Sequence, residues 1–135
     1  MVSDPDDGDD ELETLCLGTR CTIVALRKVV KAYRALDHKR RGRLDRILKN
    51  FCDHDPRDLP QEQFTSEDRK STGGKPAKEV MVYAFKVWQF RMYGVNAPIS
   101  GKCRFVATEV DTDKKRDKAD PQLLAAAARA ARPFV

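Results

Sequence analysis

Residues 79–94 (EVMVYAFKVWQFRMYG) constrain the fold more than any other stretch, because apolar and aromatic residues run through them almost without interruption. Alternation predicts a core face formed by every second residue: Val80, Val82, Ala84, Trp88, Phe90 and Met92. The opposite face mixes rings, an amide and a guanidinium, which suits a binding surface: Tyr83, Phe85, Val87, Gln89, Arg91 and Tyr93. Sixteen residues are long for one strand, so we expect a turn or bulge near Trp88 and Gln89.

The charge of the chain favours a polyanionic partner. The formal net charge is +5, but residues 1–13 hold seven acids and no Lys or Arg, so the remainder carries 26 basic against 14 acidic residues. Such a balance indicates nucleic acid before a membrane. A basic surface without a ligand is the alternative.

The sequence also indicates a cytoplasmic compartment. No run approaches the ~20 apolar residues of a membrane span, and the acidic start is unlike a signal peptide. The four cysteines (Cys16, Cys21, Cys52 and Cys103) lack the paired spacing of a zinc site. We therefore expect reduced cysteines, mostly in the core, no metal site and no cofactor.

The first half of the chain predicts two helices. Residues 1–13 have the composition of a flexible acidic tail, which either remains solvated or lies across the basic surface as a phosphate mimic. Residues 14–21 are typical of a short strand. Apolar residues at steps of three and four predict a helix over 22–38, then a break near Gly42 and a second helix through Phe51. The basic run at 38–43 is either a phosphate contact or a solvated loop.

The second half predicts a long loop, strands and a last helix. Residues 52–76 are rich in Pro and Gly, which is typical of a loop. Residues 103–110 alternate as a strand, and Asp120 with Pro121 marks the start of a final helix. The expected fold is α+β: an N-terminal αα-hairpin packed on a small twisted antiparallel sheet, with a short C-terminal helix, in one domain over 14–135.

The candidate site is a set of cations and rings. On the sheet these are Lys86, Arg91, Tyr93 and Arg104, and before the last helix they are Lys114, Lys115, Arg116 and Lys118. A phosphate fits such cations beside the free N–H groups of a helix N-terminus. Neutralisation by nearby aspartates in a solvated loop is the alternative. Tyr83 or Tyr93 either stacks on a base or packs in the core.

These residues suit RNA cleavage. The 2′-hydroxyl attacks its own phosphate when one group removes its proton, another protonates the leaving 5′-oxygen, and cations stabilise the charge on phosphorus. The sequence has neither a Gly-rich phosphate loop nor a nucleophile elbow.

Two segments, VYAFKVWQFRMYGV and CRFVATEVDTDKKRDKADPQLLAAAARA, resemble the RelE/ParE toxin superfamily, with the RelE- and HigB-like ribonucleases nearest. The resemblance covers roughly residues 79–132. It implies a toxin that cuts mRNA, often at the ribosome, and a cognate antitoxin that neutralises it. It assigns catalytic roles to Arg91, Lys115, Arg116 and Lys86, and substrate contacts to Tyr93, Arg104, Lys114 and Lys118.

One departure from the family concerns catalysis. In RelE a Tyr follows the basic pair, whereas this chain has Ala119-Asp120-Pro121-Gln122. The departure leaves two other hypotheses open. One is a non-catalytic RelE-fold module, related to phages or mobile elements, that binds nucleic acid or protein. The other is a ParE-like gyrase poison.

Overall fold

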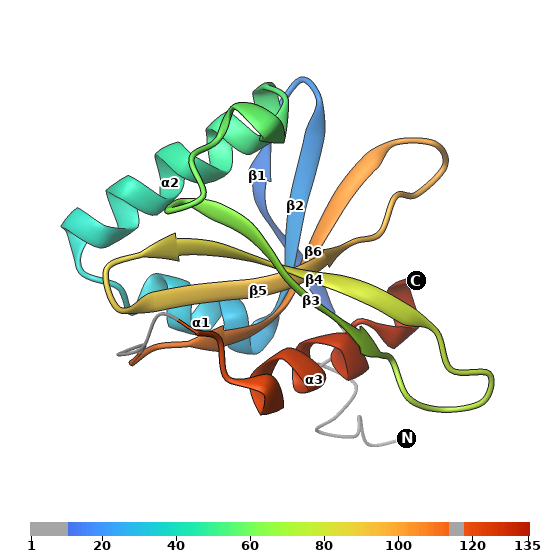
Figure 1. Ribbon diagram of the computed structural model, residues 1–135. Helices are drawn as coiled ribbons and strands as arrows, with labels where there is room; N and C mark the ends of the chain where they lie inside the picture. Colours follow the sequence, from blue (N-terminus) through green and yellow to red (C-terminus); the bar gives the residue numbers. More distant parts are fainter. Residues whose placement is uncertain (1–10, 114–117) are drawn as a thin grey trace, which may run out of the picture.

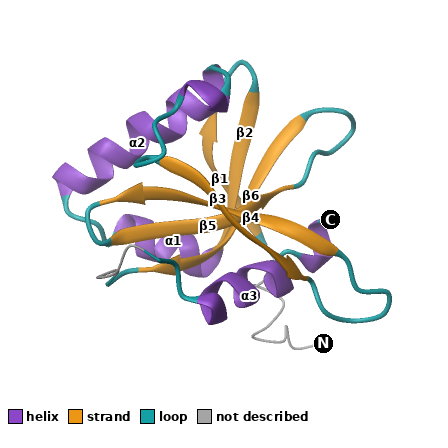
Figure 2. Ribbon diagram, in the orientation of Figure 1, coloured by secondary structure: helices purple, strands orange, loops and turns teal. Residues whose placement is uncertain are grey.

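A six-stranded sheet with helices on both faces forms the protein (Figures 1 and 2). The computed structural model describes residues 11–113 and 118–135. The elements follow in the order β1 (Leu12–Leu17), β2 (Cys21–Leu26), α1 (Arg27–Arg34), α2 (His38–Asp53), η2 (Pro56–Asp58), β3 (Phe64–Ser71), β4 (Glu79–Val87), β5 (Phe90–Asn96), β6 (Cys103–Asp111), α3 (Pro121–Ala130) and η3 (Arg132–Phe134).

The sheet is mixed, with the order β1-β2-β6-β5-β4-β3. Neighbouring strands are antiparallel except β2 and β6, which are parallel. One core cluster joins α1 and α2 to one face of the sheet, and a second joins α3 to the other. The predicted fold class is therefore wrong: a β-hairpin precedes the two helices, and the sheet is neither small nor wholly antiparallel.

The error began at residues 22–26, which we expected to be helical and which belong to β2. Ile23 and Ala25 are buried in the core beneath α1 and α2, whereas Val24 packs on the side of α3. A strand covered on both faces has a continuous apolar sequence, which periodicity does not distinguish from a buried helix.

The break between the helices also lies elsewhere. Asp37 caps α2 by accepting a hydrogen bond from the Arg40 amide at 2.8 Å, so the chain turns before Asp37 and not at Gly42. Gly42 lies inside α2, and a Cβ added there meets no atom within 4 Å. The basic run at 38–43 is therefore the first part of a helix and not a loop.

Residues 79–94 form two strands, and the predicted turn at Trp88 and Gln89 is confirmed. The predicted division of faces is wrong, because the sheet is covered on both sides: Phe85 and Val87 face α1 and α2, and Val82 and Ala84 face α3. Trp88, predicted to lie in the core, is 70% exposed. A two-residue turn projects beyond the sheet, so no strand neighbour covers its side chains.

The segment over 52–76 contains regular structure that its composition did not reveal. It holds η2 and the edge strand β3, which pairs with β4. The sequence of β3, FTSEDRKS, is mostly polar because only one edge of the strand is hydrogen-bonded and much of it is exposed. Buried and exposed residues alternate only weakly along β3, so the sequence pattern did not predict a strand.

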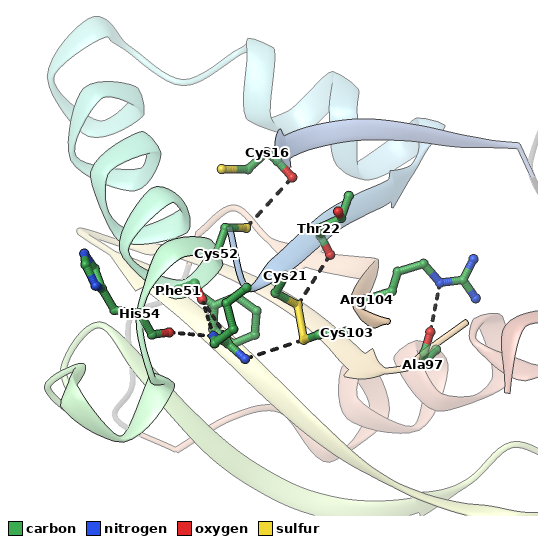
Figure 3. Close-up of a disulfide and its surroundings, with 10 residues drawn as sticks. Cys16, Cys21, Thr22, Phe51, Cys52, His54, Ala97, Cys103 and Arg104 are labelled. Carbon is green, nitrogen blue, oxygen red and sulfur yellow. Dashed lines mark hydrogen bonds between the residues drawn. A yellow bond between two sulfur atoms is a disulfide. The ribbon is translucent and has the colours of Figure 1, made fainter. Parts of the chain in front are cut away.

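Two of the four cysteines form a disulfide between Cys21 and Cys103 (Figure 3). These residues are partners in the parallel β2–β6 register, so the covalent bond joins strands that are 82 residues apart in sequence. The expectation of four reduced cysteines is therefore wrong for this pair. Cys16 and Cys52 are free, and burial raises the pKa of the Cys52 thiol to about 12.

The prediction for the last strand and helix is confirmed. β6 spans Cys103–Asp111, one residue beyond the expected end. Asp120 is the N-cap of α3, accepting a hydrogen bond from the Gln122 amide at 2.8 Å, and Pro121 occupies the first turn. Leu124, Ala127 and Ala128 are the buried residues of α3, so the alanine-rich sequence lets this helix lie close to the sheet.

Candidate nucleic-acid interface

Two predicted site residues, Lys86 and Arg91, lie opposite each other on neighbouring strands. The β4–β5 register pairs them, and the β5–β6 register pairs Arg91 with Asp111. Alternation along the strands places this row, Lys86–Arg91–Asp111, on the face covered by α3. The β4–β5 turn is only two residues from the row, so the row lies near one end of the sheet.

Side-chain contacts hold both cations of this row. The Arg91 guanidinium donates to the carbonyl oxygens of Val87 and Phe90 at 3.3 and 3.2 Å. The Lys86 ammonium lies 3.9 Å from the Glu67 carboxylate, and only 19% and 16% of the two side chains are exposed. Glu67 and Asp111 thus supply negative charge beside the cations.

Tyr93 lies in the next position of β5 on the same face and is fully buried. Its hydroxyl has no hydrogen-bond partner among the residues that the structure describes. Burial raises its pKa above the ordinary value, and the charges of Asp111 and Glu67 raise it further. A phenol in this state neither removes protons at neutral pH nor reaches a ligand without movement, and Tyr93 is part of the core on the side of α3.

The remaining predicted site residues do not all join this row. Arg104 lies at the other end of β6, roughly 23 Å along the strand from Asp111, and its guanidinium donates to the Ala97 carbonyl at 2.8 Å. Lys118 is exposed and precedes the N-cap of α3. Lys114, Lys115 and Arg116 lie outside the described residues.

A second basic surface lies between α2 and the β4–β5 turn, and it includes three cations of the run at 38–43, for which a phosphate contact was one of two predictions. It consists of two adjoining hollows of about 470 and 490 Å³. Trp88 and Arg43 line both hollows. The first is completed by Asp37, Lys39, Arg40 and Gln89, and the second by Arg46, Ile47, Asn50, Gln63, Lys86 and Val87. We call this surface the Trp88 groove.

The helical repeat explains how α2 forms one wall of the groove. Lys39, Arg43, Arg46 and Asn50 recur at steps of four, three and four residues and therefore share one side of the helix. The opposite side carries Leu44 and Leu48 into the core. Arg43 and Arg46 form no salt bridge with any residue in the described parts of the chain, so their charges are available to solvent.

The other wall of the groove is held in place by Arg40. Its guanidinium donates to the Asp37 carboxylate at 2.8 Å and to the Trp88 carbonyl at 3.1 Å. This bridge ties the β4–β5 turn to the first turn of α2, which lie side by side in Figure 1. The backbone of Trp88 is thus tied to α2, while its indole ring is exposed.

The exposure of its ring distinguishes Trp88 from the two tyrosines that we considered for base stacking. Tyr83 packs against Phe64 with parallel rings whose centroids are 5.4 Å apart, and Tyr93 is buried. Within residues 11–113 and 118–135, no ring or cation stacks on Trp88. A sequence signal for this ring existed: a Trp inside a two-residue turn has no neighbouring strand to cover it.

The described residues lack two further features. No three His, Cys, Asp or Glu side chains among them lie close enough to share a metal ion. None of their helices combines the length and the apolar character that crossing a bilayer requires.

Comparison with known proteins found no matching family model, no matching curated relative and no matching solved structure.

Proposed function

We propose that this protein binds RNA and cuts it, as the toxin of a toxin–antitoxin pair. The observation that carries the proposal is the pairing of Lys86 with Arg91 in adjacent strands, which puts two cations next to each other at one end of the sheet. The net charge of +5 adds long-range attraction for a polyanion. The resemblance of residues 79–132 to RelE- and HigB-like ribonucleases supplies the type of reaction.

In the proposed reaction the 2′-oxygen of a ribose attacks the adjacent phosphorus while the bond from phosphorus to the 5′-oxygen breaks. The 2′-hydroxyl gives its proton to water and the leaving 5′-oxygen takes one from water, so the products are a 2′,3′-cyclic phosphate and a 5′-hydroxyl. Arg91 stabilises the negative charge on the phosphoryl oxygens, a role suited to a guanidinium, and Lys86 contributes a second positive charge. The substrate is mRNA, free or on the ribosome, so the proposal requires a cytoplasmic protein with an antitoxin partner.

RNA binding without cleavage is the second candidate, and two observations favour it. Tyr93 is buried with a raised pKa, so it is unsuited to replace the general base that this chain lacks. Glu67 and Asp111 lie beside the cations and reduce their attraction for phosphate. In this second candidate the same cations position an RNA that the protein does not cut.

The test is the double variant Lys86→Ala/Arg91→Gln, since glutamine removes the charge of Arg91 and keeps an amide donor for the carbonyls that Arg91 contacts. The control is Arg69→Gln/Lys75→Gln, which removes the same charge from exposed positions in β3 and the β3–β4 loop. Circular dichroism checks that each variant folds. Growth is followed after induced expression, and transcript 5′ ends are mapped.

We expect wild type and control to inhibit growth and to produce new 5′ ends, and the double variant to do neither. Growth inhibition by the double variant equal to that of wild type would contradict the proposed site. Salt-dependent RNA binding by wild type without new 5′ ends would instead establish the second candidate. Each cation that contacts a phosphate should contribute about 0.7 to the slope of log K against log salt.

A further inference from the structure

We infer that the Trp88 groove binds unpaired nucleotides of RNA, with a base stacked on the indole and the phosphates on both sides held by arginines. This inference rests on the proposed RNA binding and names the form of RNA recognised. It concerns a surface different from the Lys86–Arg91–Asp111 row.

The exposed ring carries the first step of the argument. Trp88 is 70% exposed, and residues in the described parts of the chain leave its ring unstacked. An exposed indole offers a flat face for stacking, and every nucleobase offers another. In a duplex the faces of the bases are already stacked on each other, so an open indole selects single strands.

Charge carries the second step. Four cationic side chains of α2 line the two hollows (Lys39, Arg40, Arg43 and Arg46) against one carboxylate, that of Asp37. Arg40 and Asp37 contact each other, whereas Lys39, Arg43 and Arg46 have no salt-bridge partner among the described residues. These three cations lie along one side of α2 beside the ring, where they can contact phosphates.

Rigidity carries the third step. The hydrogen bond from Arg40 to the Trp88 carbonyl fixes the turn against α2 before any ligand arrives. Stacking on a side chain whose backbone is already held costs less conformational entropy than stacking on one in a mobile turn. Volumes of 470 and 490 Å³ lie within the range of small-ligand pockets, so each hollow has room for a nucleotide.

Lys86 borders this groove close to the proposed cleavage site. It lines the second hollow and also pairs with Arg91. Its side chain follows the alternation of β4 onto the face covered by α3, where its ammonium lies 3.9 Å from the Glu67 carboxylate. The groove and the row therefore lie on opposite faces near the same end of the sheet, so each can be tested alone.

The chain contains one Trp, so its intrinsic fluorescence reports on this groove alone. The probe is a twelve-nucleotide single-stranded RNA, compared with a duplex of equal length and with poly-glutamate as a polyanion without bases. We expect the single strand to quench Trp88 emission at saturation, and the duplex and poly-glutamate to bind without quenching. Equal quenching by poly-glutamate would overturn stacking and point to an acidic protein as the ligand.

Affinities of variants, measured with a labelled RNA, complete the test. Trp88→Ala should weaken single-strand binding about 5- to 150-fold and leave the fold intact, because the ring is mostly exposed. Arg43→Gln/Arg46→Gln should weaken binding and lower the salt dependence. The charge-matched control Arg69→Gln/Lys75→Gln lies in and after β3, whose connection to β4 is at the far end of the molecule from the Trp88 turn (Figure 1).

The outcomes separate the two proposals. If wild type binds RNA, Lys86→Ala/Arg91→Gln weakens binding and Trp88→Ala does not, the inference fails and the proposed function stands. If Trp88→Ala weakens binding and Lys86→Ala/Arg91→Gln leaves both binding and toxicity unchanged, the proposed site fails and the groove stands. An absence of RNA binding by wild type at low salt overturns both.

Discussion

Breaking the disulfide between Cys21 and Cys103 should be the most destabilising single covalent change in this protein. The bond joins partners in the parallel β2–β6 pair, 82 residues apart in sequence. The perturbation takes two forms: reduction of the wild-type protein, and the double variant Cys21→Ala/Cys103→Ala. Both release the same loop in the unfolded chain, so both should lower the free energy of unfolding.

The expected size follows from the length of the loop. Closing a loop of about 80 residues removes conformational entropy from the unfolded chain worth roughly 4.5 kcal/mol at 25 °C. Measured disulfides commonly contribute about 2–4 kcal/mol, because unfolded chains retain some structure. For a chain of this length the loss corresponds to a fall in Tm of roughly 7–16 °C.

Urea denaturation of the oxidised, reduced and double-variant proteins measures the effect. The reduced wild type and the double variant should unfold at similar urea concentrations, both well below that of the oxidised protein. A reductant should leave the double variant unchanged, which controls for the free thiols of Cys16 and Cys52. If oxidised and reduced wild type share one midpoint, the loop-entropy reasoning is refuted.

Two further predictions concern α2 and the segment that follows it. Gly42→Ala should raise the free energy of unfolding by about 0.5–1 kcal/mol, because Gly42 is helical with open space at its Cβ; a destabilised variant in urea denaturation would contradict this placement. Hydrogen bonds from Arg57 lower the pKa of Asp55 from 3.8 to about 2. This pair therefore stabilises the fold above pH 3.8 and loses its effect as pH falls towards 2, and Asp55→Asn should flatten the pH dependence of the urea midpoint in that window.

The predictions from sequence were correct where neighbouring residues alone determine the structure. The turn at Trp88 and Gln89, the strand over 103–110 and the cap of α3 at Asp120 each depend on neighbouring residues alone. It failed at residues 22–26, where burial on both faces made a central strand look helical. Whether such a segment is a strand or a helix depends on which elements cover it, and the local sequence does not encode that.

The candidate sites divide in the same way. The pairing of Lys86 with Arg91 follows from the short turn between them, so local sequence alone determines it. The Trp88 groove needs α2 to lie beside that turn, which depends on contacts between residues about 48 positions apart, such as Arg40 and Trp88. The pairing of Cys21 with Cys103 likewise required the β2–β6 register.

The parallel contact between β2 and β6 determines the order in which the protein can be completed. β2 is made early, and its inner neighbour is the last strand to be synthesised. Until then the β1–β2 hairpin has an unpaired edge, whereas β3, β4 and β5 can pair as they emerge. A ribosome-bound chain that stops before residue 103 therefore lacks the strand that joins the two parts of the sheet.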